Sequence, residues 1–161
     1  MWVSPYSCSM RVCNGPKLPA HEGAVKFNVD GSFLLNRVGC GGVLRNHKGE
    51  VIAIFSGPVD CFGTDYSELV AVKMVLNLFK ETNMFGKARL VIESDSQIVL
   101  KWLQNFSTRP WKLWSLFEEI DRNLKEIPGT IFVFVPRARN SFADFLAKSG
   151  AKRNELFKAH W

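Results

Sequence analysis

The chain has 161 residues, 47% of them apolar, so it can form one domain with a sizeable core. No apolar run approaches the ~20 residues of a membrane span, and the N-terminal residues lack the charged region and apolar block of a secretory signal. The formal net charge is +6 and the pI is near 9.3, which is typical of proteins that bind nucleic acid. Composition therefore excludes a membrane-spanning protein. It favours nucleic acid over a membrane surface as partner, because no basic amphipathic helix stands out.

Residues 1–23 lack hydrophobic periodicity and contain several prolines and glycines, which predicts a linker or a poorly ordered N-terminal arm. The four cysteines contain no close pair with the spacing of zinc ligands. They are Cys8, Cys13, Cys40 and Cys61. We predict reduced thiols in an intracellular protein, with disulfide bonds as the alternative.

Three strands are predicted next, at residues 24–31, 39–46 and 50–59. Their close spacing indicates an antiparallel meander, and the loop at 46–50 gives Gly49 a position suited to a positive φ. In the first strand, Phe27 and Val29 alternate with polar residues, as in a half-buried strand. Asp30 and Gly31 then have two interpretations: a turn, which is the commoner meaning of Asp-Gly, or an acid placed on a sheet.

The rest of the chain alternates helices and strands. Apolar residues at helical spacing predict a helix over 65–83, and a continuous apolar run predicts a buried central strand over 88–94. Helices at 95–106 and 110–127, the second with Pro110 in its first turn, precede a strand at 130–135. A last helix spans 140–152 with Asn140 as its N-cap, and residues 154–161 form a tail.

This order, βββαβααβα, predicts an α/β domain over residues 24–153, with a five-stranded mixed sheet and helices on both faces. The strands that begin at residues 24 and 88 can lie side by side and parallel. That arrangement would bring Asp30 close to Asp95, which follows the second of these strands.

Three further carboxylates each have a structural interpretation. Asp95 can cap the helix that follows it, and Glu68 can close a capping box with Asp65. Asp144 lies among apolar residues past the N-cap of the last helix, where an unpaired carboxylate near the core is costly. The alternative for Asp144 is an exposed acid that benefits from the helix dipole.

Together, Asp30, Glu68, Asp95 and Asp144 would repel one another and raise one another's pKa values. Mg²⁺ removes this conflict, because it prefers oxygen ligands and binds through a few carboxylates and substrate phosphates. Two such ions about 3.5–4 Å apart stabilise the attacking and leaving oxygens of a displacement at phosphorus. A basic chain with this acidic cluster therefore suits a phosphodiester substrate.

Over residues 25–152 the sequence resembles the ribonuclease H domain, in the reverse-transcriptase-like version found in plant non-LTR retroelement polyproteins and in stand-alone plant genes. The family's order and spacing are kept in KFNVDGS, GCGGVLRNHKGE, SELVAVKMVL, VIESDSQIVLKWL and VPRARNSFADFLAKSGA. The resemblance implies a ribonuclease H-like fold. It also implies hydrolysis of the RNA strand of an RNA–DNA hybrid, which leaves a 3′-hydroxyl and a 5′-phosphate.

By resemblance, Asp30, Glu68, Asp95 and Asp144 are the ligands of two Mg²⁺ ions, for which Mn²⁺ can substitute. One ion lowers the pKa of the attacking water, and the other stabilises the departing 3′-oxygen. Contacts to RNA 2′-hydroxyls would select the hybrid. The resemblance assigns substrate contacts to Gly31, Ser32, Ser96, Gln97 and Asn140.

Helix capping is the alternative role of Ser96 and Asn140. The sequence also departs from the family, since many relatives have a His ten residues before the last acid and this chain has Phe134 there. None of the three histidines, at positions 21, 47 and 160, lies in that loop. Phe cannot transfer a proton, so we expect slowed turnover rather than its loss.

Some bacterial relatives carry a basic handle that contains Trp. Here a single helix-rich segment separates Asp95 from the last strand and leaves little room for one, although NFSTRPWKLW still gathers basic and Trp residues. We expect Trp111 and Trp114 to pack in the core rather than to form a stacking platform. Arg109 and Lys112 are candidate phosphate contacts, and replacing both would then flatten the salt dependence of binding by about two units.

The first hypothesis is thus an endonuclease that cuts RNA–DNA hybrids, expected to act as a monomer in the nucleus or cytoplasm, alone or as part of a larger polyprotein. The second is a catalytically weak nucleic-acid-binding module derived from a retroelement. The third is a DNA-cutting integrase or junction resolvase of the same fold, which fits the metals but fits the DGS and ESDSQ segments less well.

Overall fold

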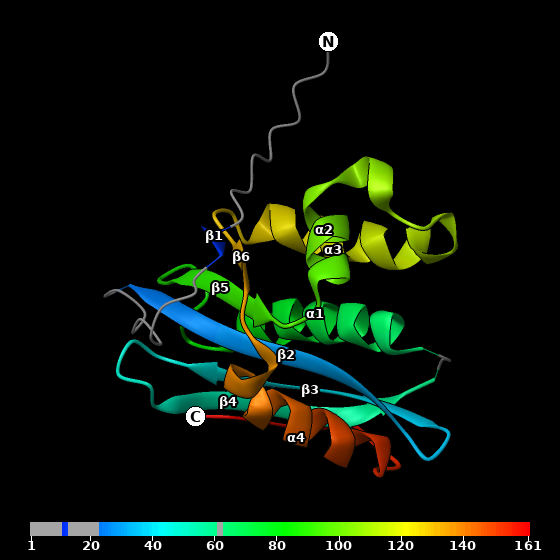
Figure 1. The fold of residues 1–161 in the computed structure, drawn as a ribbon. Helices are drawn as coiled ribbons and strands as arrows, with labels where there is room; N and C mark the ends of the chain where they lie inside the picture. Colours follow the sequence, from blue (N-terminus) through cyan, green and yellow to red (C-terminus); the bar gives the residue numbers. More distant parts are fainter. Residues whose placement is uncertain (1–10, 13–22, 61–62) are drawn as a thin grey trace.

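One mixed sheet forms the centre of the computed structural model, which describes residues 11–12, 23–60 and 63–161 (Figure 1). Its seven strands lie in the order β1-β6-β5-β2-β3-β4-β7. β1, β6, β5 and β2 run parallel, whereas β2, β3, β4 and β7 are antiparallel neighbours. The strands are β1 (Arg11–Val12), β2 (Ala24–Leu34), β3 (Arg37–Arg45), β4 (Val51–Val59), β5 (Arg89–Ser94), β6 (Ile131–Phe134) and β7 (Phe157–His160).

The predicted fold class is confirmed, and β2 to β6 are the five predicted strands. The sheet is nevertheless larger than predicted, because a short strand is added at each edge. β1 has two residues, and β7 lies inside the segment 154–161 that was expected to be a tail. β7 is mostly exposed and so lacks the apolar alternation that reveals a strand in a sequence. The rest of the predicted arm, residues 1–10 and 13–22, lies outside the described residues.

The turn between β2 and β3 answers the question raised by Asp30 and Gly31. β2 continues through both residues to Leu34, and the chain reverses at Leu35 and Asn36 instead. These two residues have φ values of 50° and 61°, as expected at the two central positions of a type I′ hairpin. The turn interpretation of Asp30-Gly31 is therefore wrong. The other predicted hairpin loop is confirmed, with Gly49 at φ 83°.

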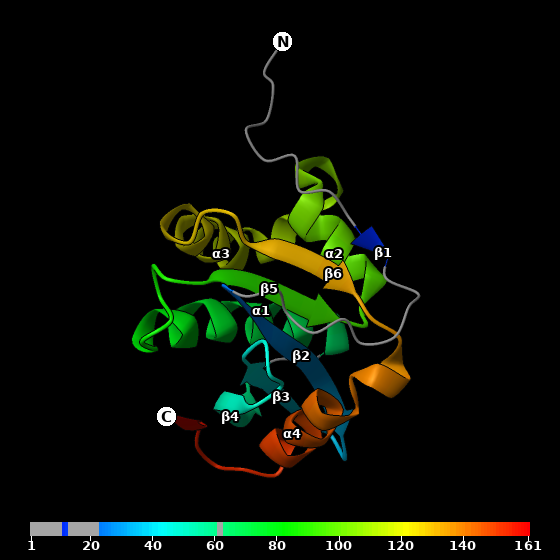
Figure 2. The ribbon, with the colours of Figure 1, turned by 90° about the vertical axis from the view of Figure 1, so that its left-hand side faces the viewer.

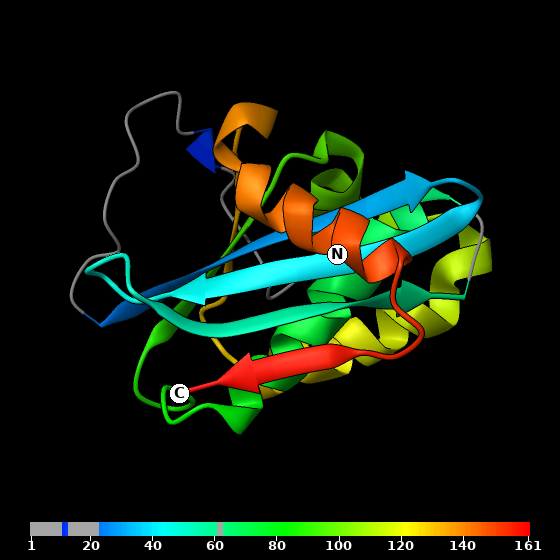
Figure 3. The same cartoon turned by 90° about the horizontal axis from the view of Figure 1, so that it is seen from below.

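Helices cover both faces of the sheet, as predicted (Figure 2). α1 (Thr64–Glu81) packs against β2 and β3 and also against α3 (Trp114–Glu126). α4 (Ser141–Ala151) packs against β2, β3 and β4 and crosses the sheet in front of it in Figure 3, where β7 borders β4. α2 (Gln97–Gln104) contacts α1 and β6.

Two glycines of β3 explain how α4 comes so close to the sheet. A Cβ on Gly41 would lie within 2.5 Å of the backbone N of Ala147, and one on Gly39 would collide with the Ala151 backbone N. The absence of side chains lets the helix backbone rest on the strand. α4 is thereby fixed over β2 and β3, with its first turn near the acid of β2.

The segment between α2 and α3 differs from the prediction of a helix over 110–127. It forms two 3₁₀ turns, Phe106–Thr108 and Trp111–Leu113, before α3 begins at Trp114. The cause is local: the Asn105 side chain accepts from the Ser107 backbone N–H (3.1 Å), and Pro110 is extended with ψ 131°. In the part of the chain that the structure describes, no helix combines the length and apolarity needed to cross a membrane.

Candidate active site

The first site residue, Asp30, is held on β2 with its side chain largely buried, and the residue is 4% exposed. Its Oδ1 accepts from the Gly31 backbone N–H (2.9 Å). A Cβ on Gly31 would lie within 2.5 Å of the Glu68 backbone N and would collide with Ser67 Oγ. Glycine therefore lets the start of α1 rest directly on β2, and this contact brings Glu68 to Asp30.

Glu68 belongs to this cluster and not to a capping box. The N-cap of α1 is Gly63, and no side chain caps the helix. Glu68 is 7% exposed, and Ser94 Oγ donates to its Oε2 (3.4 Å). The carboxylate of Glu68 thus faces the C-terminal end of β5 and not the backbone at the start of its own helix.

Asp95 follows β5 directly, and its capping interpretation is also wrong. The N-cap of α2 is Ser96, whose Oγ accepts from the Val99 backbone N–H (3.4 Å). The capping alternative for Ser96 is therefore confirmed. β2 and β5 pair in parallel, with Asn28 opposite Glu93, so Asp30 and Asp95 each come two residues later on adjacent strands.

These three acids form one cluster, in which one carboxylate oxygen from each residue lies within 4.8 Å of the other two. Burial, the nearby Asp95 and the nearby Asp144 raise the pKa of Asp30 to about 6, against the opposing effect of a hydrogen bond with Glu68. Burial and the adjacent Asp30 raise the pKa of Glu68 further. Burial raises the pKa of Asp95 as well, although the Arg137 guanidinium opposes the rise.

The donor set of this cluster fits a hard divalent cation. All three groups offer carboxylate oxygens, which suit Mg²⁺ and Mn²⁺ rather than the softer metals that prefer thiolate ligands. A cation would also remove the repulsion that raises the pKa values of the acids. Asp30, Glu68 and Asp95 could therefore hold such an ion.

Asp144 lies close enough to raise the pKa values of Asp30 and Asp95, but it is outside the group of three. Its Oδ2 lies 2.6 Å from Lys148 Nζ, and its Oδ1 lies 4.0 Å from a terminal nitrogen of Arg137. These two basic partners were not predicted from the sequence. The i, i+4 spacing of Asp144 and Lys148 on a helix was the available signal.

The other predicted site residues lie in different environments. Asn140 is at the N-cap position of α4 but makes no capping bond; its Nδ2 donates instead to the Val29 carbonyl (2.7 Å), and the residue is 1% exposed. The capping alternative for Asn140 is therefore wrong. Ser32 is buried, whereas Gln97 is exposed at the first position of α2.

Phe134, which stands where many relatives have His, is part of β6 and pairs with Ser94 of β5. It is half-buried and packs against the hydrophobic core. The side chain is therefore a structural neighbour of the strand end that carries Asp95, and it brings no titratable group to the site.

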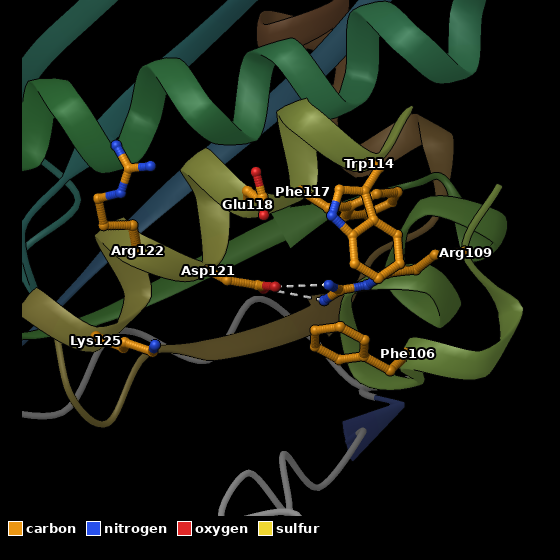
Figure 4. Close-up of a pocket in the computed structure, with 8 residues that line it drawn as sticks. All are labelled: Phe106, Arg109, Trp114, Phe117, Glu118, Asp121, Arg122 and Lys125. Carbon is orange, nitrogen blue, oxygen red and sulfur yellow. Dashed lines mark hydrogen bonds and ion pairs between the residues drawn. The ribbon is translucent and has the colours of Figure 1, made fainter. Parts of the chain in front are cut away.

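A second feature is a surface cavity of about 340 Å³ between α3 and the segment after α2 (Figure 4). Arg109 lines this cavity, and its Cζ lies 3.9 Å from the ring centre of Phe106 and 4.4 Å from that of Phe117. Its Nη1 lies 2.7 Å from Asp121 Oδ2. The side chain of Arg109 is only 5% exposed, so it is not available to a phosphate.

Trp111 and Trp114, the second of which lines this cavity, were expected to pack in the core, and that expectation is wrong. Trp111 is 78% exposed and Trp114 is 57% exposed. Lys112 Nζ lies 5.8 Å from the centre of the Trp111 ring and is exposed. Trp111 lies in the second 3₁₀ turn, and Trp114 is the first residue of α3 and is not on its buried face; helical periodicity over 110–127 could not reveal this.

The chain is similar to known proteins in its sequence pattern and in its fold. The model of the family "reverse transcriptase-like" matches residues 28–150. No curated protein matches the chain. Among solved structures, ribonuclease H1 LC11, isolated from compost by a metagenomic approach, is 21% identical with a TM-score of 0.73, over 81% of this chain and 96% of that one.

Two other solved structures are similar in fold. One is LC11 ribonuclease H1 in complex with an RNA/DNA hybrid, with a TM-score of 0.71 and 20% identity over 80% of this chain and 96% of that one. The other is the protease–reverse transcriptase of prototype foamy virus, with a TM-score of 0.69 and 20% identity over 92% of this chain and 23% of that one. The chain therefore belongs to the reverse transcriptase-like family and has a ribonuclease H-like fold.

Proposed function

We propose that this protein is a metal-dependent endonuclease that hydrolyses the RNA strand of RNA–DNA hybrids. The observation that carries the proposal is the convergence of Asp30, Glu68 and Asp95, from β2, α1 and the end of β5, within 4.8 Å. The ribonuclease H-like fold supports the choice of reaction, and a hybrid is the substrate class bound by the LC11 protein of similar fold. The basic charge of the chain suits a polyanionic substrate.

In this proposal the three clustered acids hold divalent ions, two in the complete site, with Asp144 as the fourth ligand. Bound ions would activate a water molecule and stabilise the departing 3′-oxygen. The chain itself fixes the acids on rigid elements: Asp30 within a strand, Glu68 through the close contact at Gly31, and Asp95 at a strand end. Such positioning is the main contribution of a protein to reactions of this kind.

The proposed substrate contacts fall on residues near these acids. Gln97 is exposed at the start of α2, two residues after Asp95, and can reach a ligand at the strand end. Gly31 and Ser32 follow Asp30 directly on β2, but Ser32 is buried, so Gly31 is the more accessible of these two proposed contacts. Lys112 and Trp111 offer an exposed charge and an exposed ring in the turn before α3.

A second candidate function is a catalytically weak hybrid-binding module. Two observations favour it: Phe134 supplies no proton-transfer group, and the Asp144 carboxylate is paired with Lys148. In that case the acidic cluster would be retained without supporting turnover.

The test is cleavage of an end-labelled RNA–DNA hybrid in Mg²⁺, Mn²⁺ or EDTA by the full chain and by Asp95→Asn. Asp65→Asn, the same change at an exposed acid on α1, is the matched control. Cleavage that needs the metal, is lost in Asp95→Asn and persists in Asp65→Asn supports the nuclease. Hybrid binding without cleavage in either metal supports the binding module, and preferential cutting of duplex DNA would overturn both.

A further inference from the structure

A chain of buried polar groups leads from the middle of β2 to the acidic cluster. Asn28 Nδ2 donates to Glu93 Oε2 (2.9 Å) and to Asn140 Oδ1 (3.3 Å). Glu93 is the direct neighbour of Asn28 on β5, and its other oxygen lies 3.0 Å from Lys26 Nζ. Asn28, Glu93 and Asn140 are 6%, 7% and 1% exposed, so water does not compete for these bonds.

These bonds determine which way the Asn140 amide points. An amide has an acceptor oxygen on one side and a donor nitrogen on the other. Because Asn28 donates to its oxygen, the Asn140 nitrogen faces the Val29 carbonyl (2.7 Å) and the Asp95 carboxylate. A flipped amide would place an oxygen against both of these acceptors and would be repelled by each.

The orientation of Asn28 is determined in the same way. The Glu93 carboxylate can only accept, so the Asn28 nitrogen must face it. Lys26 holds the second oxygen of Glu93. Glu93 therefore fixes the orientation of the Asn28 amide, and Asn28 fixes the orientation of the Asn140 amide.

The end of this chain of bonds touches the site at two places. Val29, whose carbonyl accepts from Asn140, immediately precedes Asp30. The Asn140 amide also lies close enough to the Asp95 carboxylate to lower the pKa of that group. Asn140 also precedes α4 at its N-cap position, and its carbonyl accepts from the Asp144 backbone N–H (3.0 Å). One buried amide thus connects the three elements that carry Asp30, Asp95 and Asp144.

We propose that Asn28, held in place by Glu93, is a positioning residue: through Asn140 it fixes Asp30 and Asp95 in the arrangement that binds a divalent ion. This inference rests on the proposed function, because it concerns the same acids. Groups that hydrogen-bond to metal ligands typically change metal affinity by about 10–100-fold when they are replaced. Asn140, at 1% exposed, acts here as a buried connector and not as a substrate contact.

The test is Mn²⁺ binding to the full chain, measured by calorimetry and by electron paramagnetic resonance, without substrate. Asn28→Leu keeps the approximate shape and removes both donors, so it should weaken Mn²⁺ binding by about tenfold. Asn28→Ser retains one donor and should lie between Asn28→Leu and the unmodified chain. Glu93→Gln, which can still accept from Asn28 but no longer fixes its orientation, should also weaken binding, and less than Asn28→Leu.

A control separates positioning from general stability. Thr82→Val removes another buried side-chain hydrogen bond, to the Phe79 carbonyl (2.7 Å) at the far end of α1. It should lower the unfolding temperature and leave Mn²⁺ affinity unchanged. If both Asn28 variants lower the unfolding temperature and bind Mn²⁺ as the unmodified chain does, Asn28 is purely structural and the inference is overturned.

The two proposals fail in different ways. Absence of Mn²⁺ binding to the unmodified chain, together with absence of hybrid cleavage, would remove the metal site itself and with it the proposed function. Normal Mn²⁺ binding by the unmodified chain and by folded Asn28→Leu or Asn28→Ser would overturn only the positioning role. If Asn28→Leu does not fold, the serine and glutamine variants decide between these outcomes.

Discussion

Lys148 follows Asp144 by one turn of α4, and its Nζ lies 2.6 Å from Asp144 Oδ2. The lysine is therefore paired with a carboxylate that would bind a cation in the proposed site. Removing this competitor should favour metal binding. Lys148→Gln is expected to tighten Mn²⁺ binding by about twofold, the scale of a partly exposed ion pair. Calorimetry measures the effect, with Lys152→Gln near the end of the same helix as control. An equal change in both variants would show a general charge effect instead.

The raised pKa of Asp30 predicts that the free energy of unfolding depends on pH. With an ordinary pKa of 3.8 when unfolded and about 6 when folded, the folded chain keeps the proton longer, so stability falls as pH rises through this interval. Asp30→Asn removes this cost. In EDTA it should stabilise the chain by about 3 kcal/mol well above pH 6 and have little effect below pH 4. Urea unfolding at several pH values measures the difference; a gain independent of pH would contradict the assignment.

Gly31→Ala tests the close contact between β2 and α1. Its methyl group would collide with Ser67 and with the Glu68 backbone, so α1 must move away from Asp30. We expect a loss of about 3 kcal/mol in the free energy of unfolding, as for other overpacked sites, together with weaker Mn²⁺ binding. Gly49→Ala, in an open hairpin loop with a positive φ, should cost only about 1 kcal/mol. Similar losses in the two variants would show that the contact at Gly31 is not tight.

Phe134→His tests the departure from the family pattern. If hybrid cleavage is observed, the introduced imidazole should raise kcat by up to ~100-fold, the lower end of general acid–base contributions, with little change in KM. Phe134→Leu is the control for altered packing on β6. A kcat that does not rise in a folded Phe134→His variant would disprove the prediction that the missing His slows turnover.

Of the two expected phosphate contacts near Trp111, only Lys112 is exposed. Arg109 is buried and paired with Asp121, so its replacement by Met should destabilise the chain by about 3 kcal/mol without removing a phosphate contact. Lys112 is exposed, and Lys112→Ala should reduce the salt slope of hybrid binding by about one unit. Titrations at several salt concentrations measure the slope, with Lys48→Ala in the β3–β4 loop as control. An unchanged slope in Lys112→Ala would exclude the contact.

The sequence by itself determined the order of β2 to β6 and of the four α-helices, and it singled out Asp30, Glu68 and Asp95, which the fold brings together. Period-two alternation located β2, and a continuous apolar run located β5, because burial on one face or on both leaves a pattern along the chain. The parallel pairing of β2 with β5 followed from this order, and it predicted that Asp30 and Asp95 would lie on adjacent strands. Glu68 was also placed correctly, although its capping interpretation was wrong.

Only the tertiary structure decided how side chains from distant segments meet. The pairing of Asp144 with Lys148, the burial of Arg109 and the orientation of Asn140 depend on which element packs against which, and a linear pattern does not contain that information. β7 also escaped prediction, because an exposed edge strand is stabilised by pairing with β4 and not by burying a periodic face. Periodicity records burial, whereas a site depends on contacts across the fold.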